Sequence, residues 1–310
     1  MGSVKFLRKR YESALASDDL YTAEQTCLTI VHRMRTRKDV DKSEAEKAGR
    51  DMILEGSMAL IDRGAIHSGT SLGLELVKTL IEDMVMYRDS KENLFALINA
   101  YEKHKLEADE QSELVRLLRA CVDFSKKEGL GERMYGDELL NLMTAEALWK
   151  QSSFSSALDF FVRSPAPQRC GLMVHEWSNS AANDPKSPLV VVRAVLAYLT
   201  SGNLADAIVV VSINKLKRKS DEGGADLLAS QIAFSDMLLK IIQRQGAYPL
   251  MAKLREHYNL ILNKEDQSVQ KKLDLVAEMY FGVKPGGNTM QDMMSEVMKG
   301  FFGGSSSSFR

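Results

Sequence analysis

The sequence predicts an all-α fold, an α-solenoid of diverged tetratricopeptide-like helical hairpins. Three observations carry this prediction. Apolar residues recur three and four positions apart along most of the 310 residues, helix-interrupting residues are sparse at 6 Pro and 20 Gly, and a degenerate hairpin motif recurs. Alternation with a period of two is nearly absent. The best candidate for a strand, Ile208–Ile213, fits a helix equally well.

The helical periodicity is clearest in four segments: Leu139–Trp149, Leu189–Leu199, Leu227–Ile242 and Val269–Tyr280. Breaks are expected where Gly, Pro and Ser gather, at Gly129–Gly131, Ser164–Pro167, Asn183–Pro188 and Ser220–Gly224. A further helix is expected to stop at Gly282. The most apolar stretches, Leu189–Leu199 and Leu204–Ile213, are too short to span a bilayer, so we expect no stable membrane insertion.

The hairpin motif has a large apolar residue, a polar turn, an apolar residue five positions later and an Ala three further on. Copies run from Leu15 to Ala23, from Trp149 to Ala157 and from Leu199 to Ala207, and Ile61–Gly73 fits loosely with Gly69 at the Ala position. A small residue there lets the second helix approach the first closely. Adjacent copies are roughly 45–50 residues apart, so the array is not a strict tetratricopeptide repeat of about 34 residues.

Composition excludes several classes of function. Lys and Arg number 41 against 42 Asp and Glu, a formal net charge of −1, which argues against bulk electrostatic binding to nucleic acid. The three cysteines are odd in number and lie far apart, which argues against a disulfide framework. Met1–Arg10 has no apolar core of a secretory signal. These features predict a reduced, cytosolic protein.

No motif of catalysis, metal binding or phosphate binding is complete. His175-Glu176 begins like the zinc motif HExxH, but Asn179 occupies the position of the second His. No Walker loop, dinucleotide fingerprint or nucleophile elbow occurs. We therefore expect a protein that is not an enzyme, with no cofactor and no metal site.

A basic run near the start of the chain contains Arg33, Arg35, Arg37 and Lys38. The favoured interpretation is the solvated C-terminal end of a helix, where cations suit the helix dipole. The alternative is an electrostatic docking surface for an acidic partner. Lys215–Lys219 allows the same two interpretations. Neither run is interleaved with aromatic residues, which further disfavours nucleic-acid binding.

The C-terminal part, residues 284–310, is predicted to contain a linker, a Met-rich amphipathic helix and a disordered tail from Gly303. One face of the helix carries Met290, Met293, Met294, Val297, Met298, Phe301 and Phe302. Two interpretations stay open. This face folds back as a terminal cap, or it forms an adaptable Met-lined surface for a partner or hydrophobic client.

Three stretches resemble one family, the conserved scaffold subunit of the GET (guided entry of tail-anchored proteins) pathway, the Golgi-to-ER traffic protein four family. Asp19–Gln25, with Thr29-Ile30 and Arg33, resembles its N-terminal repeat. Ala145–Lys150 and Phe154–Phe161 resemble its central repeat. Its C-terminal signature is similar to Tyr280–Pro285 followed by Gln291–Met294 and Phe301–Gly304. The order matches over essentially the whole chain.

The resemblance implies a non-enzymatic cytosolic scaffold that bridges a ubiquitin-like-domain adaptor, with its co-chaperone, to the targeting ATPase that delivers tail-anchored membrane proteins to the ER. Animal members of the family also serve a BAG-family quality-control complex. Residues 1–150 are expected to hold the ATPase and residues 151–283 the adaptor.

The expected ATPase-binding residues are Arg33, Arg35, Arg37, Lys38 and Glu75. The family can carry acidic contact residues after the second repeat loop, where this chain has Ser71 and Lys78, with Glu75 and Asp83 nearby. The expected adaptor-binding residues follow the polar loop Asp221–Gly224 and are more apolar than a surface helix requires. They are Leu227, Leu228, Ile232 and Phe234, with Phe234 as the central anchor. Met290, Met294 and Phe301 mark the tail helix.

Two other classes of protein remain. One is a different helical-repeat scaffold, such as a proteasome-lid-like subunit, although such subunits usually end in a winged-helix module with strands and none is evident after Gly224. The other is an enzyme on a helical scaffold, which the incomplete motifs disfavour.

Overall fold

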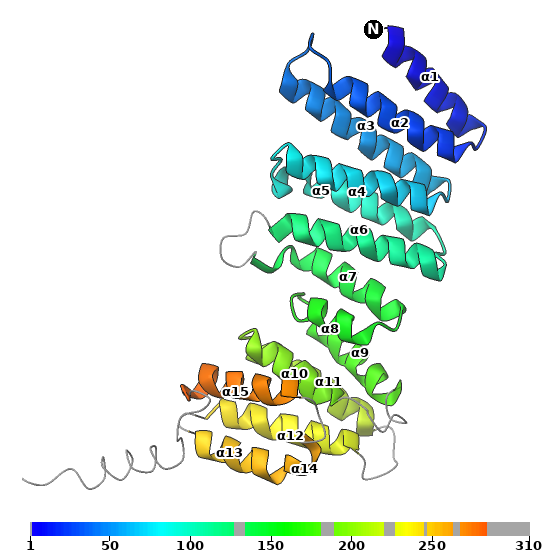
Figure 1. Cartoon of the computed structure of the whole chain (residues 1–310). Helices are drawn as coiled ribbons and strands as arrows, with labels where there is room; N and C mark the ends of the chain where they lie inside the picture. The colour runs from blue at the N-terminus through cyan, green and yellow to red at the C-terminus, as the bar shows by residue number, and fades with distance from the viewer. Residues whose placement is uncertain are drawn as a thin grey trace, which may run out of the picture. The chain divides into compact units, whose positions relative to one another are not determined.

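The computed structural model describes residues 2–126, 134–180, 189–219, 227–244, 247–262 and 267–283. Within these ranges the chain forms fifteen α-helices and no β-strand (Figure 1). The chain divides into two compact units, Met1–Pro165 (unit 1) and Ala166–Arg310 (unit 2). Each unit is a stack of helical hairpins, which confirms the predicted all-α class.

Unit 1 holds eight helices, and most pack against the next helix in sequence. They are α1 (Gly2–Ala16), α2 (Leu20–Arg35), α3 (Lys42–Asp62), α4 (Ile66–Glu82), α5 (Tyr87–Ala100) with the 3-10 turn η1 (Tyr101–Lys103), α6 (Ala108–Lys126), α7 (Glu138–Lys150) and α8 (Phe154–Phe161). Aspartate caps begin three of them: Asp19, Asp41 and Asp137 accept hydrogen bonds from backbone N–H groups of the first turn.

Unit 2 is organised around α10. Its helices are α9 (Pro167–Ser180), α10 (Val190–Thr200), α11 (Leu204–Lys219), α12 (Leu227–Ile242), α13 (Tyr248–His257), α14 (Asn259–Leu262) and α15 (Gln267–Phe281). Helix α10 packs against α9, α11, α12 and α15. A helix surrounded in this way needs apolar residues on every face, which explains why this segment is among the most apolar of the chain.

The hairpin motif corresponds to a recurring turn. A left-handed residue stands at the same place in all four copies: Asp18 (φ 54°), Gly64 (φ 79°), Ser152 (φ 56°) and Gly202 (φ 80°). In each copy the next residue donates its backbone N–H to the carbonyl five positions earlier, as Ala65 does to Leu60 at 3.0 Å. This arrangement is the Schellman ending of a helix. The loosely fitting copy at Ile61–Gly73 is therefore a true member of the series.

The small residue of the motif lies where the two helices of a hairpin meet. Ala23, Ala157 and Ala207 are all 0% exposed. In the fourth copy a Cβ on Gly69 would lie 2.5 Å from the Ile61 side chain and 3.1 Å from backbone atoms of α3. That distance leaves no room for a methyl group, so this copy carries Gly where the others carry Ala.

Replacing Ala157 or Ala207 with Leu is expected to lower the free energy of unfolding by about 1–3 kcal/mol, because extra methylene groups enter a closely packed contact. Thermal unfolding followed by circular dichroism measures the change. Ala205→Leu is the matched control, since Ala205 is exposed on the same turn of α11 as Ala207. Equal melting temperatures for the Ala207 and Ala205 variants would contradict the close contact.

Several predicted boundaries are confirmed. Helix α8 ends at Phe161 and α9 begins at Pro167, on either side of the predicted break at Ser164–Pro167. Helix α15 ends at Phe281, and Gly282 follows it with φ 70°. The other three breaks lie outside the described residues, and so does the tail helix with Met290, Met294 and Phe301. The division of partners at residue 150 stays a prediction, and unit 1 itself extends one helix further, to Pro165.

Candidate interaction surfaces

The basic run spans the C-terminal end of α2 and the residues that follow it, and one of its members is part of a partly buried ion cluster. Both terminal nitrogens of Arg35 donate to the Asp83 carboxylate at 2.8 Å. Arg50 of α3 donates to the same carboxylate. The Asp83 side chain is only 3% exposed. Arg35 therefore joins α2 to the end of α4 and is already occupied by contacts within unit 1.

The charge state of Asp83 follows from this environment. Burial alone would raise the pKa of Asp83, but the hydrogen bonds from Arg35 and Arg50 outweigh burial and leave the pKa of the carboxyl below its ordinary value. Asp83 is consequently ionised at neutral pH. The sequence placed Asp83 among the acidic residues near the expected ATPase contacts, whereas its burial between two arginines leaves it little surface for a partner.

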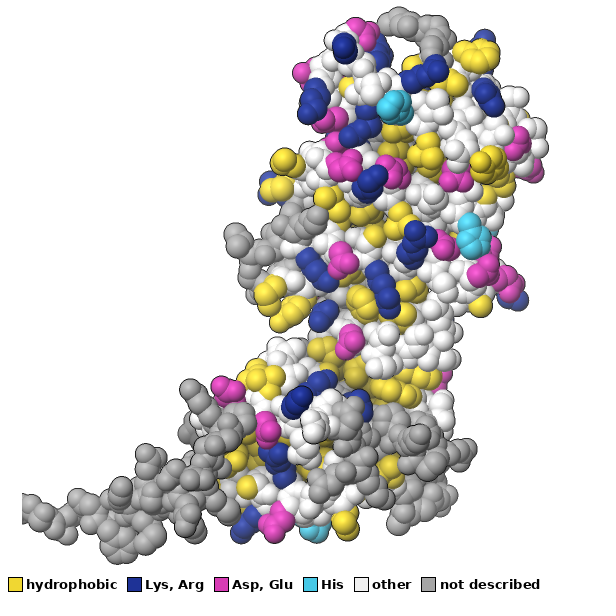
Figure 2. Space-filling model, viewed as in Figure 1, with side chains coloured by type: hydrophobic (Ala, Val, Ile, Leu, Met, Phe, Trp, Pro, Cys, Tyr) yellow, Lys and Arg dark blue, Asp and Glu magenta, His cyan; other side chains and the backbone are white. Residues whose placement is uncertain are grey.

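The other predicted ATPase-binding residues differ in their exposure to solvent. Arg37 pairs with Asp39 at 2.6 Å, and Glu75 accepts from Lys78 at 3.2 Å. Arg33 and Lys38 are exposed. Figure 2 shows acidic and basic side chains intermingled over one face of unit 1. The run is thus not a uniform positive patch, and Arg33 and Lys38 are its most accessible members.

Lys78 and Ser71, which depart from the family's acidic pattern, lie on α4 and are both exposed. Lys78 also approaches Glu82 at 4.0 Å. One lysine therefore offsets part of the charge of two glutamates on this helix. The acidic character of this face is weaker here than the resemblance implies.

The four predicted adaptor-binding residues all lie on α12, but the structure divides them. Leu227 is 41% exposed and Leu228 is half-buried. Ile232 is 5% exposed and Phe234 is 1% exposed, with the Phe234 ring packed edge-on against Tyr258 at 5.4 Å. Phe234 is thus a core residue of unit 2. It lacks the surface that a central anchor needs, while the assignment of α12 to the adaptor stays a prediction.

The structure also exposes apolar side chains of unit 2 that the sequence did not single out. They are Leu216 on α11, Met237 on α12, Leu250 on α13, Leu260 on α14, and Leu275 and Met279 on α15. Leu216 is 65% exposed and Leu260 is 84% exposed. Leu275 and Met279 are four positions apart, so they lie on one face of α15. Singly scattered exposed apolar residues are ordinary on protein surfaces, so these residues by themselves define no docking surface.

The incomplete zinc motif has a structural explanation. The Asn179 side-chain amide lies 3.2 Å from Nε2 of His175, one helical turn away on α9. The amide therefore engages the ring nitrogen that a metal would need. Among the described residues no group of His, Cys, Asp and Glu side chains is placed to hold a metal ion. Within the same ranges no helix is both long enough and apolar enough to cross a membrane.

Two units of packed helices with recurring hairpin turns define the class of α-helical repeat proteins. Residues 43–302 match the family model described as Golgi to ER traffic protein 4. The chain belongs to this family, which places it in the GET pathway for the targeting of tail-anchored proteins. The family consists of scaffold-type proteins, and the alternative of a proteasome-lid-like subunit is set aside.

Individual relatives are distant but cover most of the chain. The human Golgi to ER traffic protein 4 homolog is 23% identical over 92% of this chain and 82% of its own length. Protein GET4 of Arabidopsis thaliana is 23% identical over 80% of this chain and 83% of its own. A crystal structure of C. therm. Get4 superposes with a TM-score of 0.71 at 23% identity, covering 99% of this chain and 98% of that one. This structural likeness supports the fold.

Proposed function

We propose that this protein is a non-enzymatic cytosolic scaffold that binds a ubiquitin-like-domain adaptor and the targeting ATPase at the same time, so that tail-anchored clients pass from one to the other. One observation carries the proposal. A chain of this family divides into two compact units, each large enough to present its own surface. In this proposal unit 1 holds the ATPase, unit 2 holds the adaptor, and animal relatives add a BAG-family complex.

The test is reconstitution from purified proteins. The full chain is mixed with the ATPase and the adaptor from the same organism, and complexes are sized by light scattering after gel filtration. We expect one complex that contains all three proteins, and we expect titration calorimetry to give the same adaptor affinity with and without bound ATPase. Mutually exclusive binding of the two partners would rule out a bridge.

The accessible cations of the basic run are proposed to accelerate association with the ATPase. Replacing Arg33 and Lys38 together by Glu should slow association about tenfold at low salt and leave dissociation nearly unchanged, because long-range charge acts mainly on the encounter. Wild-type association should also slow as salt is added. Stopped-flow fluorescence measures both rates.

Arg63→Glu with Lys47→Glu is a suitable control, since these cations are also exposed in unit 1 but lie outside the run. An equal effect of both double variants would mean that net charge matters and the position does not. If the wild-type association rate does not depend on salt, long-range charge does not accelerate ATPase binding.

A further inference from the structure

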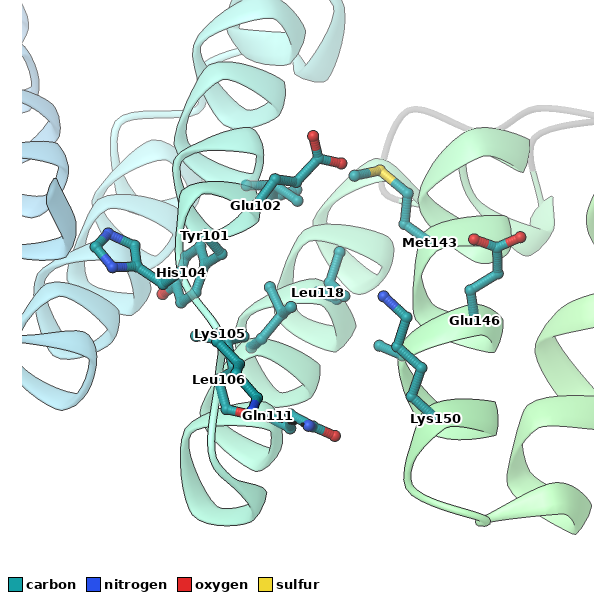
Figure 3. Close-up of a pocket in the computed structure, with 13 residues that line it drawn as sticks. Tyr101, Glu102, His104, Lys105, Leu106, Gln111, Leu118, Met143, Glu146 and Lys150 are labelled. Carbon is teal, nitrogen blue, oxygen red and sulfur yellow. Dashed lines mark hydrogen bonds between the residues drawn. The ribbon is translucent and has the colours of Figure 1, made fainter. Parts of the chain in front are cut away.

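Unit 1 contains a groove that the two proposed surfaces do not use. It has a volume of about 510 Å³ and lies between α6, α7 and the segment that connects α5 to α6 (Figure 3). Its apolar lining consists of Ile98, Leu106, Leu114, Leu118, Met143 and Ala147. Pockets of this size and composition are typical of sites that bind small ligands or a few side chains of a peptide.

The connecting segment forms one wall of the groove and is held firmly. The Tyr101 hydroxyl lies 2.6 Å from Oγ1 of Thr70 in the core of the unit. After η1 the chain turns extended at His104. The Gln111 amide donates to the Leu106 carbonyl at 3.1 Å and so anchors the far end of the segment to α6. The groove is therefore preformed, which reduces the entropy that a bound segment must lose.

Helix α7 forms the opposite wall, and Leu118 of α6 lies between the two walls (Figure 3). Lys150 extends its ammonium group from α7 into the gap beside Leu118. Glu102 and Met143 point toward each other across the groove. Met143 lies on α7, two helical turns before Lys150. One end thus presents the carboxylate of Glu102 and the other end the ammonium group of Lys150, while Glu146 on α7 also borders the groove.

Two lysines that border the groove, Lys105 and Lys150, are available to a ligand. Among the residues that the structure describes, neither Lys105 nor Lys150 is in an ion pair, although most lysines of the α4–α6 region have a carboxylate partner. Both lysines are exposed to solvent, and both line the groove. A cation beside an apolar surface is best complemented by a ligand that carries an anion next to an apolar group.

We propose that this groove binds a short segment of a partner protein that places an aliphatic side chain against Leu114 and Leu118 and a carboxylate against Lys150. Glu102 then sets the direction of the segment, because a second carboxylate at its end of the groove would meet like charge. This site lies on unit 1, away from the basic run of α2. Besides the proposed ATPase and adaptor sites, it gives the scaffold a third binding site, which recognises a short linear motif.

Selection from a displayed library of random nine-residue peptides, with the full chain as bait, tests the proposal. We expect the enriched peptides to share an acidic residue next to Leu, Ile or Met. Fluorescence polarisation of a labelled winning peptide then compares variants. Lys150→Glu should weaken binding about tenfold or more, because it replaces an ion-paired contact by repulsion. Ala147→Trp should weaken binding by filling the groove.

Lys253→Glu is the matched control, since Lys253 is exposed on α13 of unit 2. It should change the peptide affinity less than twofold, and circular dichroism melts should show that all three variants are folded. No enriched motif, or a motif peptide that binds the Lys150 and Lys253 variants equally, would overturn the proposal. Binding that appears only after deletion of residues 284–310 would also overturn it, because the chain's own tail would then be the occupant.

Discussion

Replacing Asp83 by Asn is expected to lower the free energy of unfolding by about 3 kcal/mol. The change removes the negative charge that Arg35 and Arg50 share and leaves two partly buried guanidinium groups facing each other. Three helices, α2, α3 and α4, lose their common ion cluster at once. Urea unfolding followed by circular dichroism measures the difference.

Asp39→Asn is the matched control. It also removes a carboxylate that pairs with an arginine, but the Arg37–Asp39 pair is largely exposed, with Asp39 at 68%. Exposed pairs contribute little to stability, because water and salt screen the attraction. If the two variants lose the same stability, the Asp83 cluster does not hold the helices together.

The pH dependence of this effect has a definite sign. The folded-state pKa of Asp83 lies below the unfolded value of about 3.9. The stabilisation is therefore fully present above the unfolded pKa and is lost as the pH falls through the lower, folded pKa. The difference between wild type and Asp83→Asn should be constant near neutral pH and should shrink below about pH 4.

Replacing Phe234 by Ala is expected to destabilise unit 2 by about 3–5 kcal/mol. The substitution empties a site that is 1% exposed and removes an edge-on ring contact with Tyr258. Adaptor binding should fall together with the folded fraction. The measurement is a thermal melt paired with titration calorimetry against the adaptor at several temperatures.

Leu227→Ala separates folding from docking. Leu227 is 41% exposed at the start of α12, so its truncation should hardly change the melting temperature. If α12 docks the adaptor, this variant should weaken adaptor binding severalfold while the fold is intact. A Phe234→Ala protein that melts like wild type would contradict the core assignment.

The helices and their hairpins could be predicted from the sequence because they depend on interactions between residues that are close along the chain. The recurring motif predicted where Ala23, Ala157 and Ala207 would lie, and all three are buried at helix contacts. It did not predict the left-handed conformation of Asp18 and Ser152, since neither is Gly. The Schellman hydrogen bonds of the turn stabilise that conformation and offset its steric cost.

The roles of individual residues were harder to predict from the sequence. Arg35 and Lys38 look alike in the sequence, yet one is bound in an ion cluster and the other is exposed. Leu227 and Phe234 belong to one apolar segment, yet one lies at the surface and the other in the core. Composition and spacing do not distinguish these cases, because each depends on which other helix covers the residue.

The sequence by itself determined the helical class, the hairpin turns and the family. Helix periodicity and turn geometry arise from residues within about five positions of one another, so a single chain segment contains all the information. Only the tertiary structure decided that Asp83 pairs with Arg35, 48 residues away, and that Glu102 and Lys150 border one groove. Such pairs form when stacked helices bring distant residues together, and no local pattern specifies which side chains meet.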